Sequence, residues 1–322
     1  MQQARPDDLF EDLGHGITAI DTGFVRPRFD AAYLIVHAGR AAYVDTGTND
    51  ALPRLLGALA RQGLEAADVD YLIVTHVHLD HAGAAGSLMR ELPNAKLVVH
   101  PRGAPHMIDP SALVKGASAV YGDEEVARTY GVVQPVPADR VLATHDGMTL
   151  DLAGRPLHFI DAPGHARHHH GIWDEASRGW FTGDCFGISY PEFASAHDRL
   201  VIPTTTPVQF DPVAMKHTIG RLLERNPARM YLTHYGCIDT PSSFGAQLLE
   251  QVDAMVAIAR AAGGADRHAS LREHLGRLYR QRWRERGSTL DDAAMDALIT
   301  VDVELNAQGL GVWLDRPAKA SA

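Results

Sequence analysis

Cysteine is scarce in this chain, whose 322 residues include only Cys185 and Cys237. A secreted protein stabilised by disulfides has many more, so the sequence is not that of a disulfide-rich scaffold. We interpret both cysteines as small buried residues of a reducing compartment rather than as a redox or metal-binding pair.

Basic residues and long apolar runs are also lacking. Lys and Arg number 30 against 40 Asp and Glu, for a formal net charge of −10. Nucleic-acid binders carry basic clusters, so this balance argues against a nucleic-acid partner and favours a small-molecule substrate. No apolar run approaches the length of a membrane span. The segment from Met1 to Asp12 is polar and acidic and lacks the apolar stretch of a secretory signal, so we expect a cytoplasmic protein without a membrane partner.

A histidine-rich motif follows an apolar run near the first quarter of the chain. Residues 69–74 are typical of a buried strand, and the next positions read Thr-His-Val-His-Leu-Asp-His. In extended backbone His76 and His78 point the same way, because alternate side chains share a face. Asp80 and His81 come after the bend and can face a second point about 3.5–4 Å away, a typical metal–metal distance. One metal does not need four ligands, whereas two metals do.

The same order of apolar run, break and candidate ligand returns three times, ending in His165, Asp184 and His234. His165 can complete one site with the first two histidines of the motif, and His234 can complete another with its Asp-His pair. Asp184 has two carboxylate oxygens and can bridge. Such nitrogen and oxygen ligands suit zinc, iron or manganese. We therefore predict two divalent metal ions, zinc being favoured over iron or manganese, with the ligands His76, His78, Asp80, His81, His165, Asp184 and His234.

Taken in order, these segments resemble the metallo-β-lactamase superfamily in its dinuclear hydrolase form. The matching stretches are His76-x-His78-x-Asp80-His81, Gly164-His165, Gly183-Asp184 and Thr233-His234, preceded by Val44-Asp45-Thr46-Gly47. The resemblance covers about residues 14–240. It is consistent with an α/β fold of four-layer αββα type, two sheets face to face with helices outside. We interpret Asp45 and His169 as partners of the ligands rather than ligands, His169 because it resembles a histidine common after the family's Gly-His.

A change in composition near residue 240 predicts a catalytic domain over 1–240 and a helical appendage over 241–322. Apolar residues recur there at helical spacing, and the Gly-Gly pair at 263–264 interrupts them. The appendage can roof the site, extend the core or form the contact of a homodimer, and these alternatives stay open. An insertion at about 101–131 is expected to be helical and near the site.

The predicted activity is that of a metallo-hydrolase that cleaves a small ester, lactone or thioester. In this hypothesis a hydroxide held between two metals attacks the substrate, and Asp80 orients the hydroxide and passes its proton to the leaving group. The nearest likeness is to a less characterised group related to hydroxyacylglutathione hydrolases and lactonases. The stretch after Asp184 does not resemble the glycine-cysteine-glycine-arginine sequence of the former, which argues against glutathione thioesters as substrates.

Two alternatives remain. One is a mononuclear-iron sulfur dioxygenase, which uses the two-histidine motif, the later histidine and the aspartate. The other is a non-catalytic binding protein that keeps the fold. A flavodiiron oxidase is disfavoured, because His78 stands where those enzymes typically carry glutamate.

Overall fold

Two mixed β-sheets build the first of two compact units into which the chain divides. The computed structural model describes residues 9–194, 199–239, 241–264 and 266–316. The first unit comprises Met1–Asp161, His168–Gly183 and Pro227–Asp239, and the second comprises Ala162–Arg167, Asp184–Asn226 and Thr240–Ala322. The domain limits expected from the sequence, 1–240 and 241–322, stay a prediction.

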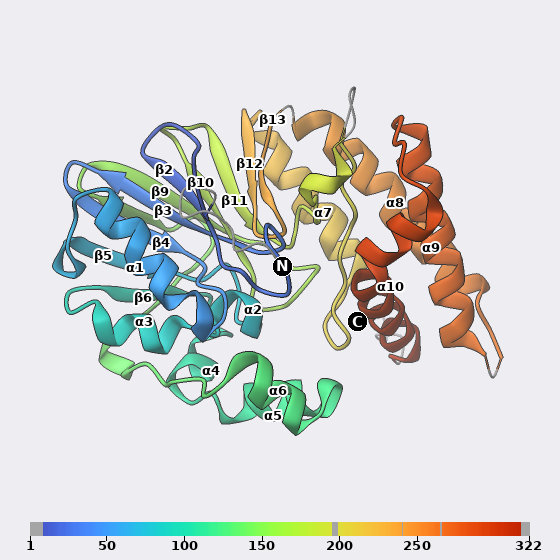
Figure 1. The fold of residues 1–322 in the computed structure, drawn as a ribbon, viewed down its shortest axis with the longest axis horizontal. Coiled ribbons are helices and arrows are strands. Elements are labelled where there is room, and N and C mark those ends of the chain that lie inside the picture. The colour runs from blue at the N-terminus through green and yellow to red at the C-terminus, as the bar shows by residue number, and fades with distance from the viewer. Residues whose placement is uncertain (1–8, 195–198, 240, 265, 317–322) are drawn as a thin grey trace. The chain divides into compact units, whose positions relative to one another are not determined.

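The first sheet has seven strands in sequence order, antiparallel as far as β4 and parallel from there on (Figure 1). The strands are β1 (Phe10–Asp12), β2 (Ile17–Asp21), β3 (Ala31–His37), β4 (Arg40–Val44), β5 (Val69–Ile73), β6 (Lys96–Val99) and β7 (Val141–Ala143). The second sheet has six strands in the order β13-β12-β11-β10-β9-β8. Its strands are β8 (Thr149–Leu152), β9 (Arg155–Asp161), β10 (His170–Asp174), β11 (Gly179–Gly183), β12 (Arg229–Leu232) and β13 (Gly236–Asp239).

Alternation along β3 shows why the two sheets pack face to face. Successive side chains of a strand point to opposite faces. Leu34 belongs to the core beneath the helices of the first unit, whereas the ring of Tyr33 lies 5.3 Å from that of Phe181 and 5.7 Å from that of Tyr231 in the second sheet. Burial of both faces explains the continuous apolar sequence of this strand.

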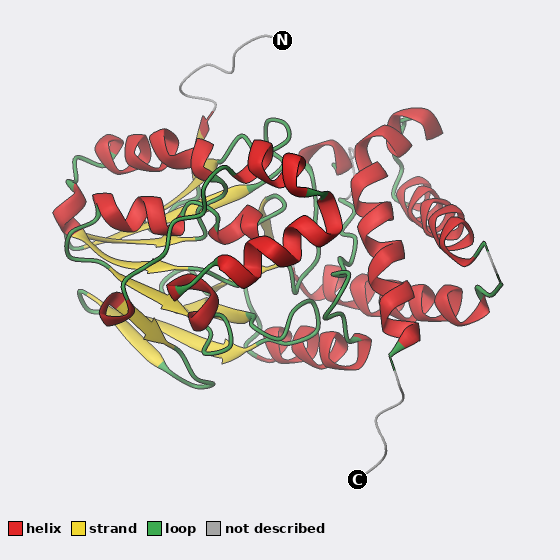
Figure 2. Ribbon diagram, turned by 90° about the horizontal axis from the view of Figure 1, so that it is seen from below, coloured by secondary structure: helices red, strands yellow, loops and turns green. Residues whose placement is uncertain are grey.

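Helices cover the outer face of the first sheet, as the colouring by secondary structure in Figure 2 shows. Helix α1 (Leu52–Arg61) buries Leu55 and Leu59, and α3 (Ala85–Glu91) buries Leu88 and Met89. The insertion forms α4 (Ala104–Ile108), α5 (Ser111–Tyr121) and α6 (Asp123–Tyr130), so the expectation that it is helical is confirmed.

The second unit contains helix α7 (Pro212–Glu224) and three long C-terminal helices. These are α8 (Pro241–Ala261), α9 (Arg267–Glu285) and α10 (Asp292–Asp315). Asp211 caps α7 by accepting hydrogen bonds from the backbone N–H groups of Val213 and Ala214. The predicted α/β sandwich with C-terminal helices is confirmed. Among the described helices, none is both long enough and apolar enough to cross a bilayer.

Candidate metal centre

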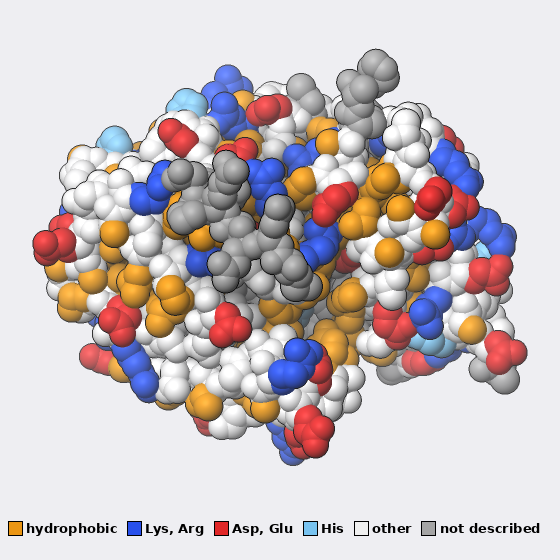
Figure 3. All heavy atoms as spheres, viewed as in Figure 1, with side chains coloured by type: hydrophobic (Ala, Val, Ile, Leu, Met, Phe, Trp, Pro, Cys, Tyr) orange, Lys and Arg blue, Asp and Glu red, His pale blue; other side chains and the backbone are white. Residues whose placement is uncertain are grey.

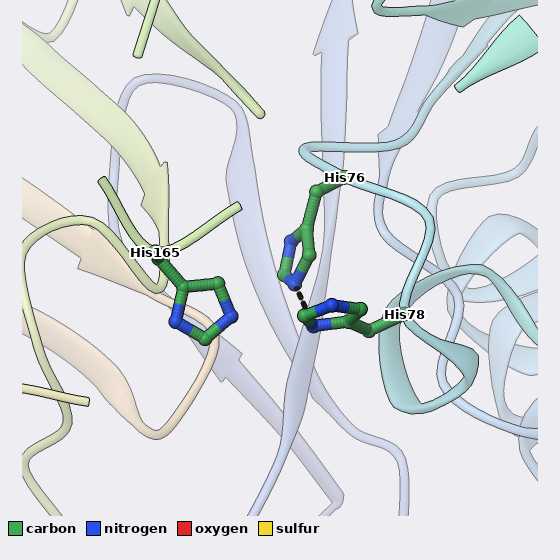
Figure 4. Close-up of side chains that lie close together, drawn as sticks. All are labelled: His76, His78 and His165. Atoms are coloured by element: carbon green, nitrogen blue, oxygen red, sulfur yellow. Dashed lines mark hydrogen bonds between the residues drawn. The ribbon is translucent and has the colours of Figure 1, made fainter. Parts of the chain in front are cut away.

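The histidine motif bridges the end of β5 and the start of the short helix α2 (Leu79–Ala82). His78 is the N-cap of α2 and keeps an extended backbone, so the chain bends after it. The Nε2 atom of His76 lies 2.8 Å from Nδ1 of His78 (Figure 4, which also draws His165 of the second unit). The other ring nitrogen of His76 lies 3.2 Å from the Thr75 hydroxyl. The two imidazoles therefore direct one nitrogen each toward a common point.

Asp80, His81 and His234 form a second constellation inside the first unit. Each offers one ligand atom, and these atoms all lie within 4.8 Å of one another. The Oδ2 atom of Asp80 is 3.5 Å from Nε2 of His234 and 3.8 Å from Nε2 of His81. Helix α2 presents the first two side chains, and the end of β12 presents the third.

The Nδ1 atoms of these two histidines point away from the shared point and have acceptors of their own. His81 Nδ1 lies 2.9 Å from Oδ2 of Asp45, and His234 Nδ1 lies 3.1 Å from the carbonyl oxygen of Phe29. An N–H that donates to such an acceptor sits on Nδ1 and leaves a lone pair on Nε2. Two imidazole lone pairs and a carboxylate oxygen then converge, a donor set that fits a divalent cation of the zinc, iron or manganese class.

Asp45 is a buried acceptor for several groups around the motif. Its carboxylate accepts hydrogen bonds from the backbone N–H of Thr75 at 2.7 Å, from the Thr75 hydroxyl at 2.8 Å and from the Thr233 hydroxyl at 2.9 Å. With the bond from His81, this carboxylate joins the ends of three strands of the two sheets. Asp45 thus fixes the ring orientation of one candidate ligand and the backbone that precedes another.

His169 packs beside the motif, with its ring stacked on that of His76 at 4.8 Å between centroids. Gly183 provides the space for this arrangement. A Cβ atom at Gly183 would meet Nε2 of His169 and would lie 2.7 Å from the Thr75 hydroxyl oxygen. The glycine that precedes Asp184 is therefore required by close packing.

His165 and Asp184 lie together in the second unit. Nε2 of His165 is 3.3 Å from Oδ2 of Asp184, and Nδ1 is 3.4 Å from the carbonyl oxygen of Thr204. The preceding Gly164 has a φ of 137°, and a Cβ there would lie 2.6 Å from Cβ of Met215. His165 thus has the same pattern as His234: Nδ1 faces a backbone carbonyl oxygen and Nε2 faces a carboxylate.

The structure adds Asp30, which the sequence patterns did not single out. Asp30 is fully buried, and Oδ2 accepts a hydrogen bond from the Thr22 hydroxyl at 2.8 Å. Burial raises the pKa of Asp30 to about 7, while the nearby His234 and His81 act in the opposite direction. The sequence search looked for ligands that follow apolar runs and therefore missed Asp30, which precedes β3. Because β3 and β4 pair antiparallel, the start of β3 lies beside the end of β4, which Asp45 follows.

Two tyrosines of the helical insertion lie within electrostatic reach of Asp80. Burial, with a smaller contribution from the Asp80 carboxylate, raises the pKa of Tyr121 to about 12. The same causes raise the pKa of Tyr130. The ring of Tyr130 is 6.0 Å from that of Phe24, and the Phe29 ring packs edge-on against His234 at 5.5 Å. The insertion therefore packs Tyr130 against Phe24 and brings two tyrosines within electrostatic reach of Asp80.

Two further histidines of the run at 168–170 contact the motif or the core. The backbone N–H of Val77 donates to Nδ1 of His168 at 3.4 Å. His170 is buried, and its Nδ1 lies 2.9 Å from the Thr144 hydroxyl. The spacing of this run gave only a general expectation of hydrogen-bonding roles, because three adjacent histidines of an extended segment point in different directions.

Comparison with known proteins identifies the class. The family profile of the Metallo-beta-lactamase superfamily matches residues 25–234, and the chain belongs to that superfamily. The matched range contains all seven predicted ligands, the last of which, His234, is its final residue. The expectation drawn from the motifs is therefore confirmed at the level of the family.

Individual relatives agree with this assignment. The chain is 29% identical over 174 residues to the metallo-beta-lactamase fold-containing protein ST1585 of Sulfurisphaera tokodaii, covering 53% of this chain and 62% of the relative. It is 22% identical over 222 residues to the beta-lactamase-like protein 2 homolog of Caenorhabditis elegans, covering 69% of this chain and 58% of the relative. The matches thus span about three-fifths of these relatives.

The crystal structure of ST1585 from Sulfolobus tokodaii superposes with a TM-score of 0.66 at 22% identity, covering 92% of this chain and 98% of that one. At this identity the likeness shows a shared fold.

Proposed function

We propose that this protein is a metal-dependent hydrolase that cleaves a small ester, lactone or thioester. The convergence of Asp80, His81 and His234 carries the proposal, since two oriented imidazoles and a carboxylate meet at one point. In this proposal those three residues hold one metal ion, and His76, His78 and His165 hold another. Asp184 would be a further ligand, since its two carboxylate oxygens suit a divalent cation. Membership of the superfamily and the pairing of His165 with Asp184 support this assignment.

Divalent ions bound by these ligands would lower the pKa of water toward neutrality and polarise the oxygen of a substrate carbonyl. The residues of the chain supply orientation and proton transfer. Asp45 and the Phe29 carbonyl hold the tautomers of His81 and His234. The side chain of Asp80 is 26% exposed, so its carboxylate can reach both the site and a substrate. It can therefore accept a proton and deliver it to the leaving group.

The surroundings of the site support a small substrate with an apolar part. Tyr121 of the insertion is 44% exposed and lies within electrostatic reach of Asp80, where its ring offers apolar surface. The net charge of −10 disfavours polyanions, because phosphate binding needs clustered basic residues. On the face drawn in Figure 3, acidic and basic side chains are interspersed. We also propose a cytoplasmic location, which the low cysteine content supports.

A combined measurement of metal content and substrate preference tests the proposal. Elemental analysis of carefully prepared protein should find close to two divalent ions per chain, and His76→Ala should lose at least one. His145→Ala is the matched control, because His145 is exposed and outside the predicted ligand set.

The panel would contain aryl esters, acyl lactones, thioesters, phosphotriesters, a chromogenic cephalosporin and a labelled RNA. We expect the highest kcat/KM among the esters, lactones and thioesters. Only trace metal, or a preference for the cephalosporin or the RNA, would overturn the proposal. Strict dependence on one iron together with persulfide-dependent oxygen uptake would replace it with the sulfur dioxygenase.

A further inference from the structure

We propose that helix α10 positions His165 by holding the segment 203–206, with Asn306 and Gly309 as the positioning residues. The inference rests on the proposed function for the role of His165 as a metal ligand. The helix, the segment and His165 all belong to the second unit. The C-terminal helices would thus contribute to the metal site through a backbone segment, a role that their sequence pattern alone does not suggest.

Asn306 is the polar contact between α10 and this segment. Its side chain is fully buried. Its Oδ1 accepts a hydrogen bond from the Thr205 backbone N–H at 2.7 Å, and its Nδ2 donates to the Pro203 carbonyl oxygen at 3.0 Å. Nδ2 also lies 2.8 Å from the Tyr279 hydroxyl of α9. A buried amide is costly unless its hydrogen bonds are made, and here both ends of the amide are used.

The residues on either side of Thr205 contact His165 directly. The Thr204 carbonyl oxygen faces Nδ1 of His165 at 3.4 Å, and the Thr206 hydroxyl donates to the His165 carbonyl oxygen at 3.1 Å. One contact orients the imidazole, and the other holds the backbone that carries it. A shift of Thr205 would therefore move both contacts, because its neighbours are covalently attached to it.

Gly309 shows independently how closely α10 approaches the segment. It lies three residues after Asn306 and therefore on the same face of the helix. A Cβ at this position would meet the Thr205 side chain and would lie 2.7 Å from the Thr206 carbonyl oxygen. Contacts this short are not tolerated, so the helix and the segment can pack in this way only with glycine at this position.

The effect of the arrangement is on the orientation of His165. The Thr204 carbonyl oxygen lies on the Nδ1 side of the imidazole, so the ring is turned with Nε2 facing Asp184 at 3.3 Å. Groups that fix a ligand histidine in this way are typically responsible for a 10- to 100-fold change in metal affinity, as an order of magnitude.

The decisive comparison is between two glycines of the same helix. Gly309→Ala should push the segment away, whereas Gly311→Ala is the matched control, since a Cβ at Gly311 has no neighbour within 4 Å. Both substitutions favour the helix itself to a similar extent, because alanine has a higher helix propensity than glycine. Asn306→Ala removes the hydrogen bonds, and Tyr190→Phe is its control, because it removes a different buried hydrogen bond to α10, that to Asp302 at 3.0 Å.

Two readouts separate positioning from folding. The first is the affinity for each of two Zn²⁺ ions, measured by competition with a chromogenic chelator on protein shown to be folded by circular dichroism. We expect Gly309→Ala and Asn306→Ala to lower the affinity for one Zn²⁺ ion by about 10- to 100-fold. The affinity for the other ion should stay near that of the wild type. The second is the set of His165 ring resonances in metal-free protein, from long-range ¹H–¹⁵N NMR assigned with His165→Gln. We expect these resonances to match wild type in the two controls and to shift in the two variants, because the surroundings of the ring change there.

Unchanged affinities and unchanged His165 ring resonances in folded Gly309→Ala would overturn the inference. The Gly309→Ala variant alone decides the question if Asn306→Ala does not fold. Equal weakening in Gly311→Ala or Tyr190→Phe would also overturn it. A wild-type protein that binds no Zn²⁺ would instead contradict the proposed function, and the NMR measurement would still report whether α10 orients His165.

Discussion

Nδ1 of His81 lies 2.9 Å from Oδ2 of Asp45, and both side chains are buried. The same arrangement recurs with backbone acceptors, at the Phe29 carbonyl for His234 and the Thr204 carbonyl for His165. Three predicted ligands, from different parts of the chain, therefore turn Nδ1 toward an acceptor and Nε2 toward a carboxylate. Fixing the tautomer before a cation binds removes part of the ordering cost of binding.

Asp45→Asn should weaken metal binding more than it weakens the fold. Asparagine keeps the shape of the side chain but places an NH₂ group or a neutral oxygen opposite His81, Thr75 and Thr233. We expect a 10- to 100-fold loss of metal affinity, as an order of magnitude. Chelator competition measures it, with Asp70→Asn as the control, because the partner of Asp70 is Arg40. Equal affinities in the two variants would contradict the role of Asp45.

Asp80→Asn should reduce turnover far more than stability. Asp80 is partly exposed and its Oδ2 faces both His234 and His81. The substitution therefore removes the negative charge that is proposed to bind the cation and to transfer the proton. The loss in kcat should be on the order of 10²-fold or more. The measurement is kcat at saturating metal, alongside urea unfolding. A variant with nearly full activity under these conditions would show that Asp80 does not have this role.

Gly183→Ala should disturb the packing of His169 against the motif. A Cβ there would meet the His169 ring and would lie 2.7 Å from the Thr75 hydroxyl oxygen. The expected cost is about 1–3 kcal/mol in free energy of unfolding, as for other overpacked sites. Gly147→Ala is the control, since Gly147 also has a positive φ, 78°, but a Cβ there has no neighbour within 4 Å. If both variants lose the same stability, backbone strain rather than the His169 contact is responsible.

His170 should make the stability of the fold depend on pH. Burial lowers its pKa from 6.5 to about 3. As pH falls below about 6.5, the unfolded chain binds a proton at this site and the folded chain does not. The stabilisation is therefore fully present above that pH and is lost progressively toward pH 3. At pH 5 the loss is about 2 kcal/mol.

Urea unfolding of wild type and His170→Phe at pH 7.5 and 5, both with chelator, isolates this contribution. Phenylalanine loses the bond to Thr144, so the variant should be the less stable at pH 7.5. The difference between the two proteins should shrink by about 2 kcal/mol at pH 5. Parallel pH curves would show that His170 is not held neutral in the folded state.

Local sequence was enough to predict the family, the sandwich and the helical character of both the insertion and the C-terminal segment. Apolar runs followed by a break report where strands end, and α8, α9 and α10 follow the apolar spacing from Phe244 onward. Candidate ligands that follow strands are visible for the same reason, because each has a signature within a few residues. The seven residues named from the sequence stay a prediction as metal ligands.

Only the tertiary structure decided which groups hold those ligands in place. Asp30 precedes its strand, and antiparallel pairing of β3 with β4 brings it near the motif. Asn306 is about a hundred residues from the Thr205 N–H that it binds. Such contacts depend on strand pairing and helix packing, which are set by the summed burial of many side chains. No short sequence pattern near either residue therefore indicates them. The chain alone therefore determined the chemistry that the site can offer, and the fold determined how that chemistry is oriented.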